Sequence, residues 1–467
     1  MIRSGETICA PATAMGGAIV ILRISGSESH SICEKIFFPS DKNIKLTDQK
    51  GFTILFGEIR DGDEIVDEVL LSIFRSPHSY TGENSAEISC HASPYIVGKI
   101  MELLIKNGAV TATPGEFTQR AFMNGKIDLS QAEAVADVIA STTFSAHKVA
   151  VNQMRGGFSD EIGRLRFELL NFASLIELEL DFGEEDVEFA DRNDLKSIIL
   201  RVKELADRLT YSFSLGNVVK NGIPVVIIGK PNSGKSTLLN ALLNEEKAIV
   251  SDIPGTTRDT IEDTITIDGL AYRFIDTAGL RDTEDVIETM GIKKTHEKIL
   301  QASVILLVDE ISDSADSINK RIAAIREMIT ESEKRLIIII NKSDISQPGQ
   351  KEDLVKEISL NDGEIMLFVS AKVKSGLEKL RFVLGEDVLK ERLNSNDVIV
   401  TNIRHYEALL HVSESLDRVL DGLNNRIPED LIAIDIRQAI HYLGEITGQI
   451  TSDEILGNIF KNFCIGK

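Results

Sequence analysis

The stretch Gly229-Lys-Pro-Asn-Ser-Gly-Lys-Ser236 decides the fold of the region around it. An apolar run from Ile223 to Ile228 precedes it and predicts a buried strand, and the stretch from Thr237 to Leu243 predicts a helix. A glycine-bracketed loop between a strand and a helix can cradle phosphate oxygens with its backbone N–H groups. The N-terminus of the helix adds partial positive charge at the same point. The stretch therefore predicts a phosphate-binding loop.

Each residue type in this loop suits one part of a bound nucleotide. Gly234 lets the backbone curl, Lys235 is expected to reach the terminal phosphates, and the Ser236 hydroxyl suits Mg²⁺. The nucleotide-binding residues expected here are Asn232, Ser233, Gly234, Lys235, Ser236 and Thr237, and Lys235 is also expected to be catalytic.

Three later stretches follow predicted strands, and open α/β sheets bind nucleotides at the carboxyl ends of their strands. Asp276 suits the Mg²⁺ shell, and Gly279 offers an unobstructed N–H to the γ-phosphate. Asp344 can accept hydrogen bonds from N1–H and the 2-amino group of guanine, which adenine does not offer there, so the nucleotide is expected to be GTP. The binding residues expected from these stretches are Asp276, Thr277, Ala278, Gly279, Asn341, Lys342, Asp344, Ser370, Ala371 and Lys372.

The loop 248–259 lies where a GTPase has its first switch, and Thr257 is expected to contact the γ-phosphate and Mg²⁺. After Gly279 comes Leu280, which has no polar atom to orient the attacking water. The acidic candidates for that role are Glu284, Asp285 and Glu288, and the residue types do not choose among them. The Asn232 side chain, with oxygens from 251–256, suits a K⁺ ion in place of an arginine finger, although Asn232 equally fits a loop-stabilising amide.

Length and composition bound the rest of the chain. Its 467 residues predict two to four domains, and 43% hydrophobic with 27% charged residues is ordinary for a globular protein. With 51 basic and 73 acidic residues the net charge is −22, so nucleic acid is not expected to be attracted by the electrostatic field of the whole protein. The four cysteines, Cys9, Cys33, Cys90 and Cys464, are widely spaced and favour a reducing cytoplasm. No membrane span is expected.

Residues 1 to about 125 alternate strand-like runs with turns and contain one helical stretch, which predicts an α+β domain. From Ser130 the apolar period becomes helical, and Ser130 with Glu133 fits a capping box. Helical pattern returns after about residue 391, so the nucleotide domain is expected to be inserted into a helical region whose two parts pack together. The expected boundaries are 1–125, 126–217 for the first helical part, 218–385 for the nucleotide domain and 386–467 for the second helical part.

Several motifs together carry a resemblance to a known family. They are Ile21-Leu-Arg-Ile-Ser-Gly26, Tyr80-Thr-Gly-Glu83, Pro114-Gly-Glu-Phe117 with Arg120-Ala-Phe122, Leu129-Ser-Gln-Ala-Glu-Ala134, Gly255-Thr-Thr-Arg-Asp259 and the terminal Phe463-Cys-Ile-Gly-Lys467. The chain resembles the tRNA-modification GTPases of the MnmE family, also called TrmE. The resemblance runs from the segment around Arg23 to the last residue, and the terminal motif is its most specific part.

The resemblance implies a multidomain fold with an N-terminal α+β folate-binding domain, a discontinuous all-α helical domain and an inserted α/β P-loop GTPase (Ras-like) domain. It implies a cytoplasmic homodimer and an FAD-containing MnmG-type partner, assembled as a heterotetramer or larger complex. Together they would add an aminomethyl or carboxymethylaminomethyl group to C5 of the wobble uridine of certain tRNAs. The cofactors implied are Mg²⁺, K⁺ and 5-formyltetrahydrofolate or another one-carbon tetrahydrofolate, and tRNA would be held mainly by the partner.

Site residues follow from the same resemblance, motif by motif. It implies Asn232, Ser251, Ile253 and Thr256 for K⁺, Ser236 and Thr257 for Mg²⁺, Glu288 for the attacking water, and Arg23, Glu87, Lys126 and Lys467 for folate. Ser251 departs from the threonine often found there but keeps a hydroxyl and a carbonyl. Cys464 invites a nucleophile hypothesis, with a positioning role as the alternative.

Two other functions fit parts of the sequence. A regulatory or ribosome-assembly GTPase would share the nucleotide motifs but would not need the terminal Cys-Ile-Gly-Lys. A folate-dependent enzyme with a GTPase merely attached would need the N-terminal motifs alone. Loss of the modified uridine on mutation of Lys235, together with folate binding, would separate the three.

Overall fold

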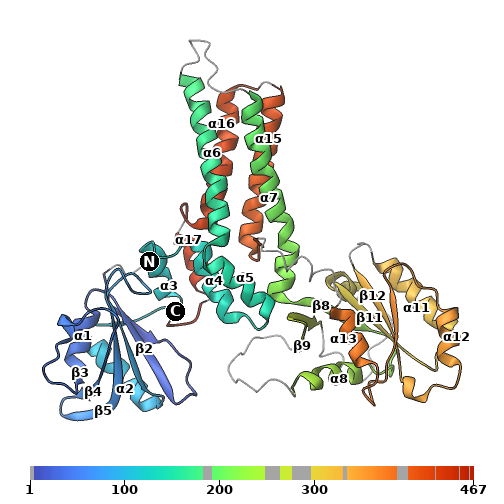
Figure 1. The fold of residues 1–467 in the computed structure, drawn as a ribbon, viewed down its shortest axis with the longest axis horizontal. Coiled ribbons are helices and arrows are strands. Elements are labelled where there is room, and N and C mark those ends of the chain that lie inside the picture. The colour runs from blue at the N-terminus through green and yellow to red at the C-terminus, as the bar shows by residue number, and fades with distance from the viewer. Residues whose placement is uncertain are drawn as a thin grey trace. The chain divides into compact units, whose positions relative to one another are not determined.

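The computed structural model describes residues 5–181, 192–247, 263–275, 296–329, 334–385, 398–425, 427–451, 453–461 and 463–466. The chain forms two compact units. The first comprises Met1–Ile139, Val151–Asp207 and Glu407–Lys467, and the second comprises Ala140–Ala150 and Arg208–Tyr406. Figure 1 labels most of their helices and several of their strands.

The first unit contains a seven-stranded sheet in the order β3-β4-β5-β6-β2-β1-β7. Its strands are β1 (Ile8–Pro11), β2 (Ile19–Ser25), β3 (Phe37–Pro39), β4 (Thr53–Asp61), β5 (Glu64–Phe74), β6 (Ser85–His91) and β7 (Val110–Thr111). All neighbouring pairs are antiparallel except β1 and β7. The helices of this region are α1 (Ser29–Ile36), η1 (Leu46–Asp48), α2 (Pro94–Lys106) and α3 (Glu116–Met123). The predicted α+β architecture is confirmed.

Side chains alternate across this sheet because successive residues of a strand point to opposite faces. Leu22, Leu71 and Ile88 are buried in one core with residues of α1 and α2. On the opposite face Phe56 and Leu70 are cross-strand neighbours, and both are exposed. One face of the sheet is therefore covered by helices, and the other carries exposed apolar side chains.

Helices from two separate parts of the chain pack together in the first unit. They are α4 (Leu129–Ala140), α6 (Gly157–Asp181), α16 (Glu429–Thr447), α17 (Asp453–Phe460), the part of α7 (Arg192–Asn221) up to Asp207 and the part of α15 (Ile403–Asn425) from Glu407. Most of α5 (Phe144–Met154) belongs to the second unit. Within the first unit, α6 packs beside α16 (Figure 1). The Lys203 ammonium of α7 lies 3.1 Å from the Asp417 carboxylate of α15 and donates to the Ser413 hydroxyl at 2.8 Å. The expected packing of helices before and after the inserted domain is confirmed.

The capping box predicted at Ser130 and Glu133 is wrong by two positions. The Asp128 carboxylate accepts from the N–H of Gln131 at 2.9 Å, and the Gln131 side-chain oxygen accepts from the N–H of Asp128 at 2.9 Å. The helix already begins at Leu129, so the residue before it provides the cap. Ser130 is buried and donates its hydroxyl to Asp128 at 3.0 Å.

The second unit contains a six-stranded sheet in the order β13-β12-β11-β8-β10-β9. Its strands are β8 (Ile223–Ile228), β9 (Asp263–Ile267), β10 (Leu270–Phe274), β11 (Val304–Glu310), β12 (Arg335–Asn341) and β13 (Ile365–Phe368), and every neighbouring pair is parallel except β9 and β10. The helices described here are α8 (Lys235–Lys247), α11 (Ala315–Met328), η3 (Ser343–Ile345), α12 (Gln350–Glu357) and α13 (Leu377–Gly385). The apolar runs from Ile223 and Leu336 lie in β8 and β12, inside the sheet, where both faces are covered, and the run from Met366 lies in the edge strand β13.

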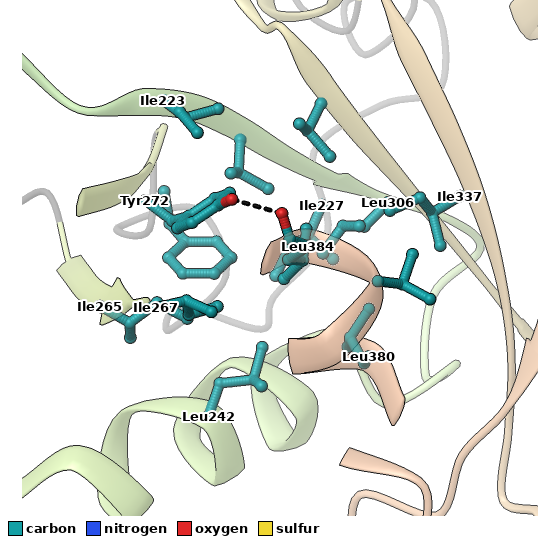
Figure 2. Packing of buried hydrophobic residues seen from close by; sticks show 14 of the residues in the cluster. Ile223, Ile227, Leu242, Ile265, Ile267, Tyr272, Leu306, Ile337, Leu380 and Leu384 are labelled. Carbon is teal, nitrogen blue, oxygen red and sulfur yellow. Dashed lines mark hydrogen bonds between the residues drawn. The ribbon is translucent and has the colours of Figure 1, made fainter. Parts of the chain in front are cut away.

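The core on one side of this sheet holds it to α8 and α13. Figure 2 shows Ile227, Leu306 and Ile337 from three parallel strands pointing into this core. Tyr272 is fully buried among them, and its hydroxyl donates to the carbonyl oxygen of Leu384 near the end of α13. The carboxyl ends of β8, β11 and β12 are thereby held at one edge of a rigid sheet.

Candidate nucleotide and folate sites

The loop after β8 has the backbone shape that its two glycines permit. Gly229 has a φ of +148° and Gly234 a φ of +92°, which L side chains rarely adopt. A Cβ at Gly229 would lie 2.1 Å from the Val308 carbonyl oxygen, and one at Gly234 would lie 2.3 Å from Nδ2 of Asn341. Both positions therefore require glycine. The loop is packed directly onto the ends of β11 and β12.

Lys235 is the first residue of α8 and reaches back over the loop. Its Nζ donates to the carbonyl oxygen of Gly229 at 3.0 Å and to that of Lys230 at 2.7 Å. Burial lowers the pKa of Lys235 below its ordinary value because the ammonium loses solvent. A positive charge is thus held at the mouth of a backbone cradle, which suits an anionic ligand.

Asn341, the last residue of β12, joins the three candidate loops. Its Nδ2 donates to the carbonyl oxygen of Ser233 at 2.9 Å, and its Oδ1 accepts from the N–H of Ala371 at 3.1 Å. The side chain is almost fully buried. A single amide therefore fixes the phosphate-type loop against both stretches predicted to read the base.

Asp344 lies in the 3₁₀ turn that follows β12. One of its carboxylate oxygens, Oδ1, accepts from the Ser370 hydroxyl at 2.6 Å. This hydrogen bond lowers the pKa of Asp344 below its ordinary value, so the group stays ionised. An ionised carboxylate can accept hydrogen bonds from two adjacent donors on a base, so Asp344 suits that role.

Two acidic residues near these loops were not predicted as functional from the sequence. The Lys342 ammonium donates to the Glu310 carboxylate at 2.6 Å, and the Lys230 ammonium donates to Asp313 at 2.6 Å. The hydrogen bond from Lys342 lowers the pKa of Glu310. Acidic residues after a strand usually belong to a solvated turn, so the sequence alone carries no signal that would identify them.

The structure brings together part of the predicted nucleotide set. Asn341 is bonded to Ser233 and Ala371, Asp344 is bonded to Ser370, and Lys235 is bonded to the carbonyl oxygens of Gly229 and Lys230 in the phosphate-type loop. Asn232 is exposed with a φ of +62°, and the Ser233 side chain is buried. Ser236 and Thr237 lie in the first turn of α8, and Lys372 follows Ala371 and is exposed. Ser251, Ile253, Thr256, Thr257, Asp276, Thr277, Ala278, Gly279, Glu284, Asp285 and Glu288 lie outside the described residues.

In the first unit, Arg23 and Glu87 are cross-strand neighbours on β2 and β6. The Arg23 Nε lies 2.8 Å from a Glu87 carboxylate oxygen. The guanidinium carbon also lies 5.3 Å from the ring centre of Tyr80 and 5.6 Å from that of Phe117. A carboxylate and two aromatic rings, one of them from α3, therefore orient this guanidinium.

The C-terminal segment docks beside the same arginine. The carbonyl oxygen of Gly466 accepts from Nη1 of Arg23 at 3.4 Å, and that of Cys464 accepts from the N–H of Gly115 at 3.3 Å. A Cβ at Gly466, where φ is +94°, would lie 2.0 Å from the carbonyl oxygen of Pro11. The close approach explains why the terminal motif needs a glycine. Lys467 itself lies outside the described residues.

Lys126 contacts the turn that carries Tyr80. Its Nζ donates to the carbonyl oxygen of Pro77 at 3.0 Å, and a Cβ at Gly82 would lie 3.2 Å from its Cγ. Tyr80 in turn lies over Arg23. Of the residues expected to bind folate, the structure pairs Arg23 with Glu87 and places Lys126 against the turn that carries Tyr80.

The four cysteines are free thiols with different exposure. Burial raises the pKa of Cys9 to about 11, that of Cys33 to about 12 and that of Cys90 to about 11. Cys464 is exposed and sits in the docked C-terminal segment. Of the four thiols, Cys464 is therefore the one accessible to solvent.

The glycine loop before α8, the Asn341 junction and the ionised Asp344 define a P-loop GTP-binding protein. Residues 7–126 match the model described as GTP-binding protein TrmE N-terminus, and residues 129–464 match the MnmE helical domain. Curated proteins described as tRNA modification GTPase MnmE are 52% identical to this chain in Bacteroides thetaiotaomicron and 53% identical in Flavobacterium psychrophilum, each over 99% of this chain and 99% of the relative. The chain therefore belongs to the MnmE family of tRNA modification GTPases and is a GTP hydrolase that acts in tRNA modification.

A solved structure, the G domain of the FeoB iron transporter of T. maritima, is 25% identical to this chain. It covers 35% of this chain and 97% of its own length with a TM-score of 0.26. A score this low adds nothing to the family assignment. Among the described residues, no helix is both long and apolar enough to cross a bilayer.

Proposed function

We propose that this GTPase acts in the cytoplasm with an FAD-containing MnmG-type partner. Together they install an aminomethyl or carboxymethylaminomethyl group at C5 of the wobble uridine of certain tRNAs. The observation that carries this proposal is the docking of the C-terminal segment on Arg23, through the Gly466 carbonyl oxygen at 3.4 Å. That contact joins the terminal motif to the proposed folate site, and neither a regulatory nor a ribosome-assembly GTPase has a use for it.

The domain boundaries of the proposal are 1–125 for the folate-binding domain, 126–217 and 386–467 for the helical domain, and 218–385 for the G domain. The ion pair between Lys203 and Asp417 supports a helical domain made of two separate chain segments.

The nucleotide roles in this proposal follow the geometry of the loops. Lys235 leaves the carbonyl oxygens of Gly229 and Lys230 to meet the terminal phosphates, because phosphate oxygens are stronger acceptors for an ammonium. Asp344 reads guanine with its ionised carboxylate. The remaining contacts come from the backbone of 232–237, from 276–279 and from the loops around Asn341 and Ser370.

Two cations complete the proposed G-domain site. Mg²⁺ neutralises phosphate charge, and Ser236 with Thr257 hold it. K⁺ supplies the charge that an arginine finger provides elsewhere, and its ligands are Asn232, Ser251, Ile253 and Thr256. The exposed amide of Asn232 in the glycine loop supports this assignment.

Glu288 is proposed to orient the attacking water when two G domains meet across their nucleotides. A positioned carboxylate accelerates such a step by about 10²-fold or more. Glu288→Ala should lower GTP turnover by that order and leave nucleotide affinity unchanged, with Glu284→Ala and Asp285→Ala as mild controls. If Glu284→Ala is inactive and Glu288→Ala has normal turnover, Glu288 is not the residue that orients the attacking water.

The proposed folate site consists of Arg23, Glu87, Lys126 and Lys467. A carboxylate suits the donor groups of a pterin, and ammonium groups suit a glutamate tail. 5-Formyltetrahydrofolate or another one-carbon tetrahydrofolate bound there would supply the carbon, and a formyl carbon would take two electrons from the reduced flavin of the partner to reach the methylene level. The ion pair between Arg23 and Glu87, flanked by Tyr80, supports a rigid polar site beside an aromatic ring. Cys464 is proposed as a positioning residue, because its carbonyl oxygen anchors the docked chain end by accepting from the N–H of Gly115.

The uncovered face of the N-terminal sheet supports a homodimer. The side chains of Ile54, Phe56 and Leu70 are 65%, 53% and 46% exposed, and they lie on two adjacent strands. An apolar patch of this kind is normally buried by a partner. Phe56→Glu should shift the protein from dimer to monomer in sedimentation, whereas Phe382→Glu, at another exposed phenylalanine, should not. If Phe56→Glu remains a dimer, this face of the sheet is not the dimer interface.

A further inference from the structure

Two carboxylates lie at the carboxyl end of β11, Glu310 as its last residue and Asp313 in the turn that follows, and we call this pair the acidic clamp. Glu310 accepts from the ammonium of Lys342 at 2.6 Å through Oε1, and its Oε2 lies 3.6 Å from the ammonium of Lys230. Asp313 accepts from the same Lys230 ammonium at 2.6 Å. The clamp therefore holds one lysine from each of two separate loops.

The acidic clamp is fixed from behind by α11. Asp313 accepts from Nη2 of Arg321 at 3.2 Å and from the N–H of Glu310 at 3.2 Å. The Nε of Arg321 lies 2.7 Å from the fully buried Asp309. The side chains of Glu310 and Asp313 are each 14% exposed. The Asp313 carboxylate is thus held by α11, whereas the Glu310 carboxylate is held by its place at the end of β11 and by the Ser312 hydroxyl, which donates to its Oε2 at 3.1 Å.

The two lysines belong to the two halves of the nucleotide site. Lys230 follows Gly229, and its carbonyl oxygen accepts from Lys235 at 2.7 Å, so it belongs to the phosphate loop. Lys342 lies between Asn341 and Asp344, in the loop that reads the base, and its φ of +58° is one that a lysine rarely adopts. A diphosphate nucleotide must contact both loops at once, so their spacing determines its affinity.

We propose that Glu310, with Asp313, is a positioning residue pair that sets the spacing between the phosphate loop and the base-reading loop. The pair acts through Lys230 and Lys342 and does not touch the nucleotide. This inference rests on the nucleotide site of the proposed function. Asn341 ties the same loops from the buried side with neutral hydrogen bonds, and the acidic clamp ties them from the solvent side with charge.

The size of the effect follows from exposure. The Lys342 and Lys230 side chains are 39% and 32% exposed, so solvent screens both pairs. Partly exposed ion pairs of this kind change an equilibrium by a few-fold. We expect removal of the Glu310 charge to lower the affinity for nucleotides that contact both loops by about fivefold.

The test compares two competitors of a fluorescent GDP on the full-length protein. GDP contacts both loops, whereas pyrophosphate contacts the phosphate loop alone. In Glu310→Gln the ratio of GDP affinity to pyrophosphate affinity should fall about fivefold, with turnover at saturating GTP unchanged. The ratio cancels the general effect of deleting one negative charge near an anion site.

Glu364→Gln is the matched control. Glu364 is 11% exposed and pairs with Arg326 of α11 at 2.6 Å, away from both loops. This variant should keep the wild-type ratio. An unchanged ratio in Glu310→Gln, or an equal fall in Glu364→Gln, would overturn the inference.

If Glu310→Gln does not fold, Lys230→Gln is the second variant, because it removes the ammonium that pairs with the acidic clamp. It should lower the same ratio, and an unchanged ratio there would also overturn the inference. Lys235→Ala tests the nucleotide site separately, and its affinities for GDP and for pyrophosphate should both be lost. If Lys235→Ala still binds both ligands, the proposed nucleotide site is wrong, and the proposal for the acidic clamp is not what has failed.

Discussion

The side-chain amide of Asn341 donates to the carbonyl oxygen of Ser233 at 2.9 Å, and so the end of β12 is tied to the phosphate-type loop after β8. Because the same amide accepts from the N–H of Ala371 at 3.1 Å, three segments far apart in the sequence meet at one buried group. Nucleotide affinity should depend on this junction.

Asn341→Asp should weaken GDP binding by about tenfold or more, because a carboxylate cannot donate to Ser233 and leaves a buried acceptor unpaired. Equilibrium binding of fluorescent GDP measures the change. Asn319 offers a control, since its amide also bridges two backbone groups, Glu357 and Ser359, but on the surface. Asn319→Asp should bind GDP normally. Wild-type affinity in Asn341→Asp would contradict the role of the junction.

Gly466→Ala should undock the C-terminal segment. A Cβ there would overlap the carbonyl oxygen of Pro11, and the φ of +94° costs an alanine about 1 kcal/mol or more. We expect binding of 5-formyltetrahydrofolate, measured by calorimetry, to weaken about tenfold, while GTP turnover stays normal.

The control for this change is Gly457→Ala in α17, where a Cβ would meet nothing within 4 Å. That variant should bind folate like the wild type. Normal folate binding by Gly466→Ala would show that docking of the chain end is not needed for the folate site.

Asp344→Asn should transfer preference from guanine to xanthine nucleotides by about 10²-fold or more, because xanthine offers an acceptor where guanine offers the 2-amino donor. The hydrogen bond from Ser370 keeps the pKa of Asp344 below its ordinary value, so the wild-type preference should not titrate between about pH 5 and 8. Competition binding with GDP and XDP across that range measures both effects. An Asp344→Asn protein that still prefers guanine would exclude Asp344 as the base reader.

GTP turnover should require K⁺ and should be poorly supported by Na⁺. Asn232 has a φ of +62°, so glycine at this position removes the amide without straining the backbone. Asn232→Gly should lose the K⁺ stimulation and bind GDP nearly as well as the wild type, whereas Asn232→Asp, which keeps an oxygen, should retain part of it. If the wild type turns over GTP equally fast in K⁺ and in Na⁺, the proposed K⁺ site is wrong.

Much of the G-domain fold was predictable because its strands are continuous apolar runs. The run from Ile337 to Ile340 is buried on both faces and cannot be mistaken for a solvated turn. The phosphate loop was predictable for a different reason, since Gly229 and Gly234 stand where no Cβ fits.

Other features depend on contacts that the sequence does not encode locally. The strands β1, β3 and β7 span four, three and two residues, which is too short for an alternating pattern to be recognised. The cap at Asp128 was missed because a serine two residues later matches the same motif. Glu310 was missed because its partners come from loops 80 and 32 residues away along the chain.

In the proposed function, this chain takes part in modifying the wobble uridine of tRNA and needs both its GTP site and its folate site. The most direct test is nucleoside analysis of tRNA from cells that lack this protein, complemented with wild type, Lys235→Ala or Arg23→Ala. We predict that the C5-modified uridine disappears in the deletion, returns with the wild type and stays absent with both variants. An unchanged content of that nucleoside in cells without the protein would contradict the account.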